Sequence, residues 1–303
     1  MVNTISVTRR IKYSMMKHWL LAARPKTLLA ALSPVAIGTQ MALVDGAFSL
    51  SALLATLLCA ISIQVGTNFC NDYCDFRQGA DTKSRKGPAR AVQSGFISPR
   101  AMLIATIIAF AITGGSAWLL YLRAGLPFLL LGALSIILGI AYTAGRFSLA
   151  YLGIADPFVL IFFGPVAVAG TQYLQSLQFD ETTILAGLGP GLISTGLLVV
   201  NNLRDIDEDR IAAKRTLAVR FGATFSRYQY AACILGAAVV PLIFAINQNS
   251  WPPALASLII IPGLLLIRKV GRSSGTELRP CLGMTAGVLL LFTILFCFGL
   301  GLG

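Results

Sequence analysis

The sequence has little charge. Only 12% of its 303 residues are Asp, Glu, Lys or Arg, 56% are hydrophobic, and the mean hydropathy is +0.78. A soluble globular protein carries roughly 25% charged residues, so this density leaves too few charges to cover a water-facing surface. The same shortage excludes intrinsic disorder, because disordered chains are polar and rich in charge. A multi-pass membrane protein is the class that remains.

Soft metal ligands are scarce as well. The chain has one histidine, His18, and its six cysteines form no C-x-x-C pair. Cys70 and Cys74 lie one helical turn apart, with no second pair to complete a metal site. Neither a zinc or iron–sulfur site nor a disulfide framework is therefore expected.

Long apolar runs dominate what is present. A span of the hydrocarbon core needs about 20 apolar residues, and runs near this length occupy 27–44, 50–70, 101–122, 126–143, 155–175, 183–203, 229–247, 251–268 and 282–302. We therefore expect an all-α membrane protein with nine transmembrane helices. Residues 1–26 are predicted to be a cytoplasmic or interfacial segment, and residues 27–303 the helical domain.

The basic residues follow this topology. The net charge is +12, and 24 residues are Lys or Arg. With nine helices, all of them except Arg123 fall before the first helix or towards the connections on the same side of the membrane. Because cytoplasmic loops carry the excess of Lys and Arg, the N-terminus is predicted to face the cytoplasm and the chain to lie in the inner (plasma) membrane. The charge thus reflects topology, and no nucleic-acid partner is expected.

Acidic residues are also few, yet they cluster. Of the 12 in the chain, most lie in the segments 71–81 and 201–210, which both follow an apolar run on the predicted cytoplasmic side. Helical periodicity places two sets of side chains on one face each. The sets are Asn68, Asp72 and Asp75, and Asn201, Asp205 and Asp209. Asp207 points away from its set and is expected to be solvated.

The two segments also suggest an internal repeat. Asn68-x-x-x-Asp72 recurs as Asn201-x-x-x-Asp205, each at the end of a predicted span. This spacing favours a diverged duplication, covering about 27–143 and 155–268. A chance match of one Asn and one Asp is the alternative.

Stacked carboxylates repel one another and are costly near a bilayer. Mg²⁺ neutralises such groups, and it binds through a few carboxylates together with substrate phosphates. Two facing acidic turns would hold Mg²⁺ ions that bind a diphosphate, with nearby cations completing the site. Those cations are Lys83, Arg85, Arg90, Lys214 and Arg215. The alternative is a pair of solvated loop ends.

This pattern indicates a lipid diphosphate whose tail lies in the bilayer. Departure of pyrophosphate, stabilised by Mg²⁺ and cations, leaves an allylic carbocation. A dry, apolar pocket would protect that cation from water until an electron-rich acceptor attacks it.

Several motifs resemble the UbiA superfamily of intramembrane aromatic prenyltransferases, from about Arg24 to the C-terminus. They are Arg24-Pro25-Lys26-Thr27, Asn71-Asp72-Tyr73 with Asp75, Gly79 and Asp81, Gly87-Pro88-x-Arg90-x-x-Gln93-x-Gly95, Tyr142-Thr143-x-Gly145, Asn201-Asn202-Leu203-Arg204-Asp205-Ile206 with Asp209, Lys214-x-Thr216-Leu217-Ala218-Val219-Arg220-x-Gly222, and Arg279-Pro280. Within the superfamily, the nearest branch prenylates 1,4-dihydroxy-2-naphthoate in menaquinone biosynthesis. The resemblance implies a helical bundle around a central cavity open to the cytoplasmic side.

The resemblance also implies roles for matching positions. It implies catalytic Asp72, Asp75, Asp205 and Asp209, which with Asp81 would bind the Mg²⁺ cofactor, and diphosphate contacts from Asn68, Arg90, Tyr142, Arg146, Asn201 and Lys214. Tyr142 could instead belong to an interfacial aromatic belt, and Arg146 could mark topology alone. Arg24 and Lys26 are read as lipid-headgroup anchors rather than ligands. Members of this branch commonly have Asn-Gly before the lysine, where this chain has Ala212-Ala213.

The expected activity is transfer of a polyprenyl chain from a polyprenyl diphosphate to 1,4-dihydroxy-2-naphthoate. Carbon dioxide and diphosphate are lost, and demethylmenaquinone is formed. Two alternatives stay open. One is a related prenyltransferase with another acceptor, such as 4-hydroxybenzoate. The other is a transporter of cations or phosphate compounds, although transporter sites tend to lie near the bilayer centre.

Overall fold

The computed structural model describes residues 16–79, 90–145 and 148–303, and within them every regular element is a helix. Eight helical segments in these residues are long and apolar enough to cross a membrane. The predicted all-helical membrane class is therefore confirmed. The predicted range 126–143 corresponds to an apolar helix of only 16 residues, so the count of nine spans stays a prediction.

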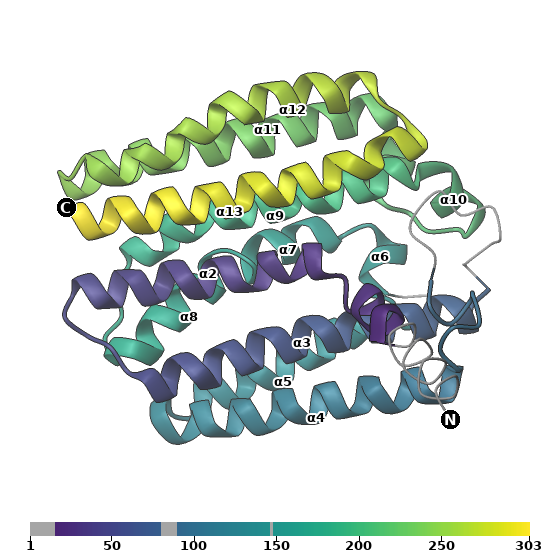
Figure 1. The fold of residues 1–303 in the computed structure, drawn as a ribbon, viewed down its shortest axis with the longest axis horizontal. Coiled ribbons are helices and arrows are strands. Elements are labelled where there is room, and N and C mark those ends of the chain that lie inside the picture. The colour runs from purple at the N-terminus through teal and green to yellow at the C-terminus, as the bar shows by residue number, and fades with distance from the viewer. Residues whose placement is uncertain (1–15, 80–89, 146–147) are drawn as a thin grey trace, which may run out of the picture.

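The helices bear the labels of Figure 1. In chain order they are α2 (Pro25–Val44), α3 (Leu50–Arg77), α4 (Pro99–Ala124), α5 (Leu126–Ala141), α6 (Leu149–Leu152), α7 (Ala155–Phe162), α8 (Pro165–Ser176), α9 (Thr182–Arg204), α10 (Ile206–Ile211), α11 (Leu217–Gln248), the 3₁₀ helix η1 (Pro252–Ile259), α12 (Ile260–Arg272), the 3₁₀ helix η2 (Gly275–Leu278) and α13 (Arg279–Leu302).

The long helices lie side by side and run back and forth along one axis (Figure 1). α3 packs against α4, α2 against α8 and α13, and α9 against α11. α9 is the inner helix, since most of its residues are buried between its neighbours. On the outer helix α4, by contrast, Ile104, Ile107 and Ile108 are exposed. Outward-facing apolar side chains suit a surface in contact with lipid.

Helix α4 shows how the sequence sets the ends of a span. Ser98 is extended, and its hydroxyl accepts a hydrogen bond from the N–H of Ala101 at 3.2 Å. Pro99 follows at the first helical position, where its missing N–H leaves no bond unmade. Gly125 ends the helix with a φ of 84°, a conformation that favours glycine.

Two predicted spans contain a break. The range 155–175 divides into α7 and α8 at Gly164, which has φ −127° and ψ −111° and precedes a proline. The range 251–268 begins as 3₁₀ helix η1, because Pro252 and Pro253 lack N–H donors, and continues as α12. Apolar run length therefore predicted which parts of the chain form apolar helices but not where those helices break.

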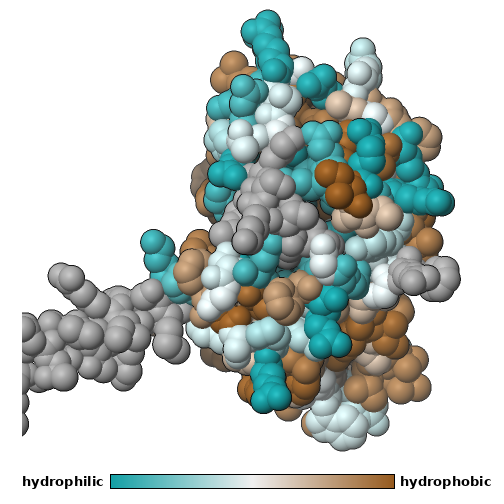
Figure 2. All heavy atoms as spheres, turned by 90° about the vertical axis from the view of Figure 1, so that its right-hand side faces the viewer, coloured by the Kyte–Doolittle hydropathy of each residue, from teal (hydrophilic) through white to brown (hydrophobic). Residues whose placement is uncertain are grey.

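Helix α3 continues past its predicted end at residue 70 as far as Arg77, so the first acidic segment begins on a helix. α3 and α9 both finish at the same end of the bundle, where α11 begins (Figure 1, right). We call this the acidic end, after Asp72, Asp75, Asp205 and Asp209. Figure 2 faces this end, and hydrophilic side chains gather on it.

Close approach of backbones around α9 leads to a prediction about stability. A Cβ added at Gly191 would collide with the carbonyl oxygen of Leu160 and lie 3.1 Å from Cα of Gly164. Because the collision is with backbone, Gly191→Ala is expected to destabilise the protein by about 1–3 kcal/mol. The measurement is the thermal unfolding midpoint of the protein in detergent.

Gly196→Ala in the same helix is the matched control. Its added Cβ would make ordinary contacts, the nearest at 3.5 Å to Tyr230. Alanine is the better helix former by about 1 kcal/mol, so this variant should melt at the same or a higher temperature. Equal midpoints for the two variants would contradict the close packing at Gly191.

Candidate active site

A lysine connects the two acidic segments. Lys214 Nζ lies 3.2 Å from Oδ1 of Asp75 and 4.0 Å from Oδ1 of Asp209. Asp75 lies in the last turn of α3, and Asp209 lies on α10. The two carboxylates, far apart in the sequence, therefore face one ammonium group. The sequence predicted that the two acidic turns face each other, and the described residues have this arrangement.

Asp75 is the most enclosed of these carboxylates. It is fully buried, and its second oxygen accepts a hydrogen bond from Arg90 Nη2 at 2.6 Å. Arg90 also donates to Oδ1 of Asn71 at 2.7 Å, and Arg24 approaches the same oxygen at 3.5 Å. Three basic side chains therefore converge on Asn71 and Asp75.

Asn71 and Arg24 were not among the predicted site residues. The signal that could have found Asn71 is its spacing, since Asn71-x-x-x-Asp75 has the form of Asn201-x-x-x-Asp205. Arg24 was read as a headgroup anchor. Its position follows from φ 53° directly before α2, which turns the chain at the acidic end.

Asn68 and Asp72 contact the backbone of neighbouring elements, and Asn68 also donates to the Thr27 hydroxyl at 3.2 Å. Asn68 Nδ2 donates to the carbonyl of Ala23 at 2.9 Å. Asp72 accepts from the N–H groups of Ala91 at 3.0 Å and Val92 at 3.4 Å. Both side chains are buried. In this arrangement they join α3 to the start of α2 and to the turn before α4, and so hold the neighbouring Asn71 and Asp75 in place.

The second segment is organised by Arg204. Its Nε and Nη2 donate to the two oxygens of Asp205 at 2.7 and 2.6 Å, and Nη2 also donates to Asn201 Oδ1 at 2.8 Å. Asp205 has non-helical φ −98° and ψ 12°, so α9 ends there and α10 begins. The predicted continuous helical face is thus interrupted, although Asp209 N still bonds to the carbonyl of Asp205 at 2.8 Å. Asp207 is exposed, in line with its predicted outward position.

Lys214 follows a strained turn. Ala213 has φ 57°, a conformation that glycine and asparagine adopt more readily. Lys214 N donates to the carbonyl of Asp209 at 2.8 Å, which directs the lysine back to the acidic segment. Its ammonium also lies 5.7 Å from the ring centre of Tyr151. The departure Ala212-Ala213 therefore still permits the turn that positions the lysine.

Tyr142 lies directly after α5 and is half-buried. A phenol is protonated at neutral pH, so the side chain can donate a hydrogen bond. Tyr142 also lines an adjoining cavity. It thereby connects the acidic end to the apolar interior. The predicted residues Asp81 and Arg146 lie outside the described residues.

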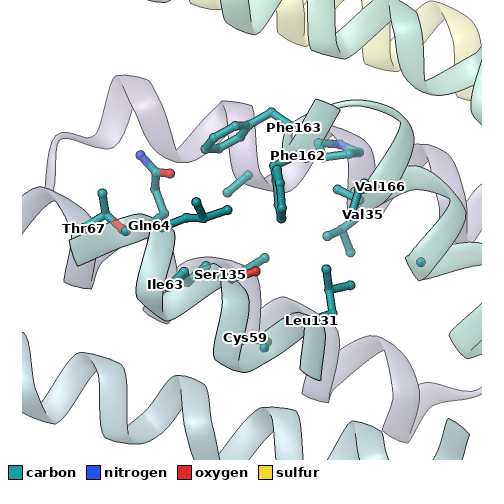
Figure 3. Close-up of a pocket in the computed structure, with 18 of the residues that line it drawn as sticks. Val35, Cys59, Ile63, Gln64, Thr67, Leu131, Ser135, Phe162, Phe163 and Val166 are labelled. Carbon is teal, nitrogen blue, oxygen red and sulfur yellow. The ribbon is translucent and has the colours of Figure 1, made fainter. Parts of the chain in front are cut away.

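The cavity has a volume of about 240 Å³ and lies between α2, α3, α5, α7 and α8. Its wall is mostly apolar, with Val35, Ile63, Leu131, Phe162 and Val166 among the lining residues (Figure 3). A long hydrocarbon chain suits such a wall better than a charged ligand. The site thus combines a charged end with an apolar chamber beside it.

Within the described residues, no group of three or more His, Cys, Asp or Glu side chains could hold a metal ion. Asp75 and Asp205 are instead paired with basic side chains. The donors are nevertheless the oxygen type that Mg²⁺ prefers, and Asp75 and Asp209 already face a common cation. The donor set therefore fits a hard divalent cation, provided that Lys214 moves to a neighbouring anion.

An all-helical membrane bundle with paired acidic segments beside an apolar chamber defines an intramembrane protein that can bind a charged head and a hydrocarbon tail together. The UbiA prenyltransferase family model matches residues 31–282. The chain belongs to this family, which confirms the resemblance seen in its motifs.

Curated relatives match nearly the whole chain. The 1,4-dihydroxy-2-naphthoate octaprenyltransferase of Haemophilus influenzae is 36% identical, over 95% of this chain and 97% of that protein. The enzyme of the same name from Escherichia coli is 35% identical, over 93% and 94%.

Solved structures share the fold. A UbiA homologue from Aeropyrum pernix superposes with a TM-score of 0.69 at 15% identity, covering 90% of this chain and 97% of that one. A UbiA homologue from Archaeoglobus fulgidus, solved with GPP and Mg²⁺, gives 0.62 at 17% identity, covering 92% and 99%.

Proposed function

We propose that this protein transfers a polyprenyl chain from polyprenyl diphosphate to 1,4-dihydroxy-2-naphthoate in menaquinone biosynthesis. The observation that carries the proposal is the Lys214 contact to Asp75 and Asp209, which brings the two acidic segments to one place beside an apolar chamber. The names of the full-length relatives support the same acceptor.

The diphosphate would bind at the acidic end. Arg90 and Lys214 supply positive charge there, and charge-assisted hydrogen bonds to phosphate are among the stronger polar contacts. Mg²⁺ would be held by Asp75 and Asp209, together with the other predicted ligands Asp72, Asp81 and Asp205. When bound, it supplies charge stabilisation to the departing diphosphate. Asn68, Asn201, Tyr142 and Arg146 stay predicted diphosphate contacts.

The prenyl chain would enter the apolar chamber from the acidic end. A cavity of about 240 Å³ holds the first isoprene units next to the diphosphate, and the rest of a longer chain would continue into the bilayer. Burial of the reacting carbon in an apolar wall keeps water away from a carbocation. Phe162 and Phe163 line this wall and offer aromatic faces that favour positive charge.

The reaction balances without an added oxidant. The bond between the prenyl C1 and the diphosphate oxygen breaks, and its electron pair leaves with the diphosphate. A ring carbon of the naphthoate bonds to C1, and the carboxylate leaves as carbon dioxide while its electron pair stays on the ring. The immediate product is the hydroquinone form of demethylmenaquinone. The residues of this site have to bind, orient and exclude water.

Topology completes the proposal. The nine-span arrangement counts α5 as a short span, places the N-terminus in the cytoplasm and opens the acidic end to that side of the plasma membrane. The distribution of Lys and Arg supports this orientation. The substrate diphosphate is then reached from the cytoplasm and the tail from the bilayer.

The experiment that tests the function is a competition between acceptors. Purified protein in lipid receives one polyprenyl diphosphate with 1,4-dihydroxy-2-naphthoate and 4-hydroxybenzoate together, and the products are identified by mass spectrometry. We expect the decarboxylated prenylnaphthalene product alone. Prenylation of 4-hydroxybenzoate alone would overturn the acceptor assignment, and movement of substrate across liposomes without any product would indicate a transporter.

A further inference from the structure

The apolar chamber has a polar patch at one end. Gln64 and Thr67 of α3 and Tyr142 after α5 all line the chamber. Thr67 of α3 lies beside Gly139 of α5, because a Cβ added at Gly139 would lie 2.6 Å from Oγ1 of Thr67. Tyr142 comes less than one turn after Gly139, towards the acidic end. The patch therefore lies at the end of the chamber nearest the acidic residues.

The amide of Gln64 is oriented by Thr27. The Thr27 hydroxyl donates to the carbonyl of Arg24 at 2.9 Å, so its lone pairs are left to accept. They face Nε2 of Gln64 at 3.2 Å and Nδ2 of Asn68 at 3.2 Å. The nitrogen of Gln64 is thereby turned to α2, and its Oε1 is left on the other side. Figure 3 shows this oxygen on the side of the chamber.

The patch is at the level where the two substrates must meet. Asn71 and Asp75 follow Thr67 by one and two turns of α3, about 6 and 12 Å along the helix axis. A diphosphate bound near Asp75 would place the allylic carbon between these groups and the chamber. An acceptor that attacks this carbon has to lie beside it, next to Gln64 and Thr67.

The opposite wall suits a flat ring. Phe162 and Phe163 lie across the chamber from Gln64 and Ile63 (Figure 3). Aromatic rings pack favourably in offset or edge-to-face arrangements. A hydroxylated aromatic ring placed here would have an apolar contact on its face and a hydrogen-bond acceptor, Gln64 Oε1, at its edge.

We propose that Gln64 binds the aromatic acceptor, with its Oε1 accepting a hydrogen bond from one ring hydroxyl. The contact would fix which ring carbon faces the prenyl group. The inference rests on the proposed function and deepens it by placing the acceptor half of the site, which the diphosphate motifs leave open.

The test separates binding of the two substrates. Gln64→Met keeps the length of the side chain and removes the accepting oxygen. We expect the KM for 1,4-dihydroxy-2-naphthoate to rise about tenfold, the usual effect of one lost hydrogen bond in a buried site. The KM for polyprenyl diphosphate should change by less than about twofold. Gln40→Met is the matched control, since Gln40 of α2 is half-buried and does not line the chamber.

Analogues identify the hydroxyl without requiring turnover. 1-Hydroxy-2-naphthoate and 4-hydroxy-2-naphthoate each lack one hydroxyl and are measured as inhibitors. Gln64→Met should weaken one analogue about tenfold and leave the other unchanged, because only one keeps the bonded group. Equal weakening of both, or a raised KM for the diphosphate alone, would overturn the proposal. A wild-type enzyme that makes no naphthoate product would instead remove the proposed function.

Discussion

Replacing Asp75 by asparagine is expected to lower turnover by roughly 10²–10³-fold, because the substitution removes a charge that organises the transition state. The amide keeps the shape of the side chain but loses the negative charge that Arg90 and Lys214 share at 2.6 and 3.2 Å. The measurement is product formation per minute in lipid, at saturating concentrations of both substrates.

Loss of a buried charge can also destabilise the fold, because Arg90 would be left with one fewer buried partner. Asp209→Asn is a second variant that carries less risk of destabilising the fold. Asp209 belongs to the other acidic segment, and its side chain is only partly buried. It should also reduce turnover strongly while the unfolding midpoint is kept.

Asp207→Asn is the matched control, since Asp207 is exposed on the same short helix. Its turnover should stay within about twofold of wild type, as is usual for surface substitutions. Full activity of both Asp75→Asn and Asp209→Asn would contradict the placement of the diphosphate at the acidic end.

Hydropathy predicted the membrane class and the approximate position of each apolar helix, because the bilayer imposes one length on every span. It could not predict the break at Gly164 or the 3₁₀ start at Pro252, which depend on individual backbone donors. Clustering of acids predicted which end of the bundle carries charge. In the described residues, Lys214 lies within 4.0 Å of both Asp75 and Asp209, so the two segments lie together at this end.

The partner of each residue in the first acidic motif was harder to predict. Asn68, Asp72 and Asp75 share a helical face, but their partners come from elements distant in the sequence. Asn68 and Asp72 contact backbone groups, whereas Asn71 shares Arg90 with Asp75. Helical periodicity predicts which side chains share one face of α3. Which of them contacts a cation depends on how α2 and the turn before α4 pack against that face. The predicted duplication is left untested by these contacts.

Removal of divalent cations is expected to abolish turnover, and this expectation follows from the charges of the site. In the described residues, Asp75, Asp205 and Asp209 face Arg90, Arg204 and Lys214 at 4.0 Å or less. The carboxylates are therefore already matched by cations. An incoming diphosphate brings several further negative charges, and divalent cations bound with it would supply the missing positive charge.

Excess EDTA should thus stop product formation, and added Mg²⁺ should restore it. EDTA already saturated with Mg²⁺ is the control for effects of the chelator itself. The unfolding midpoint should not change on chelation, because the ion pairs of the substrate-free site need no metal. Turnover at the full rate in excess EDTA would show that Arg90 and Lys214 alone stabilise the leaving diphosphate, and the acidic residues would then need another role.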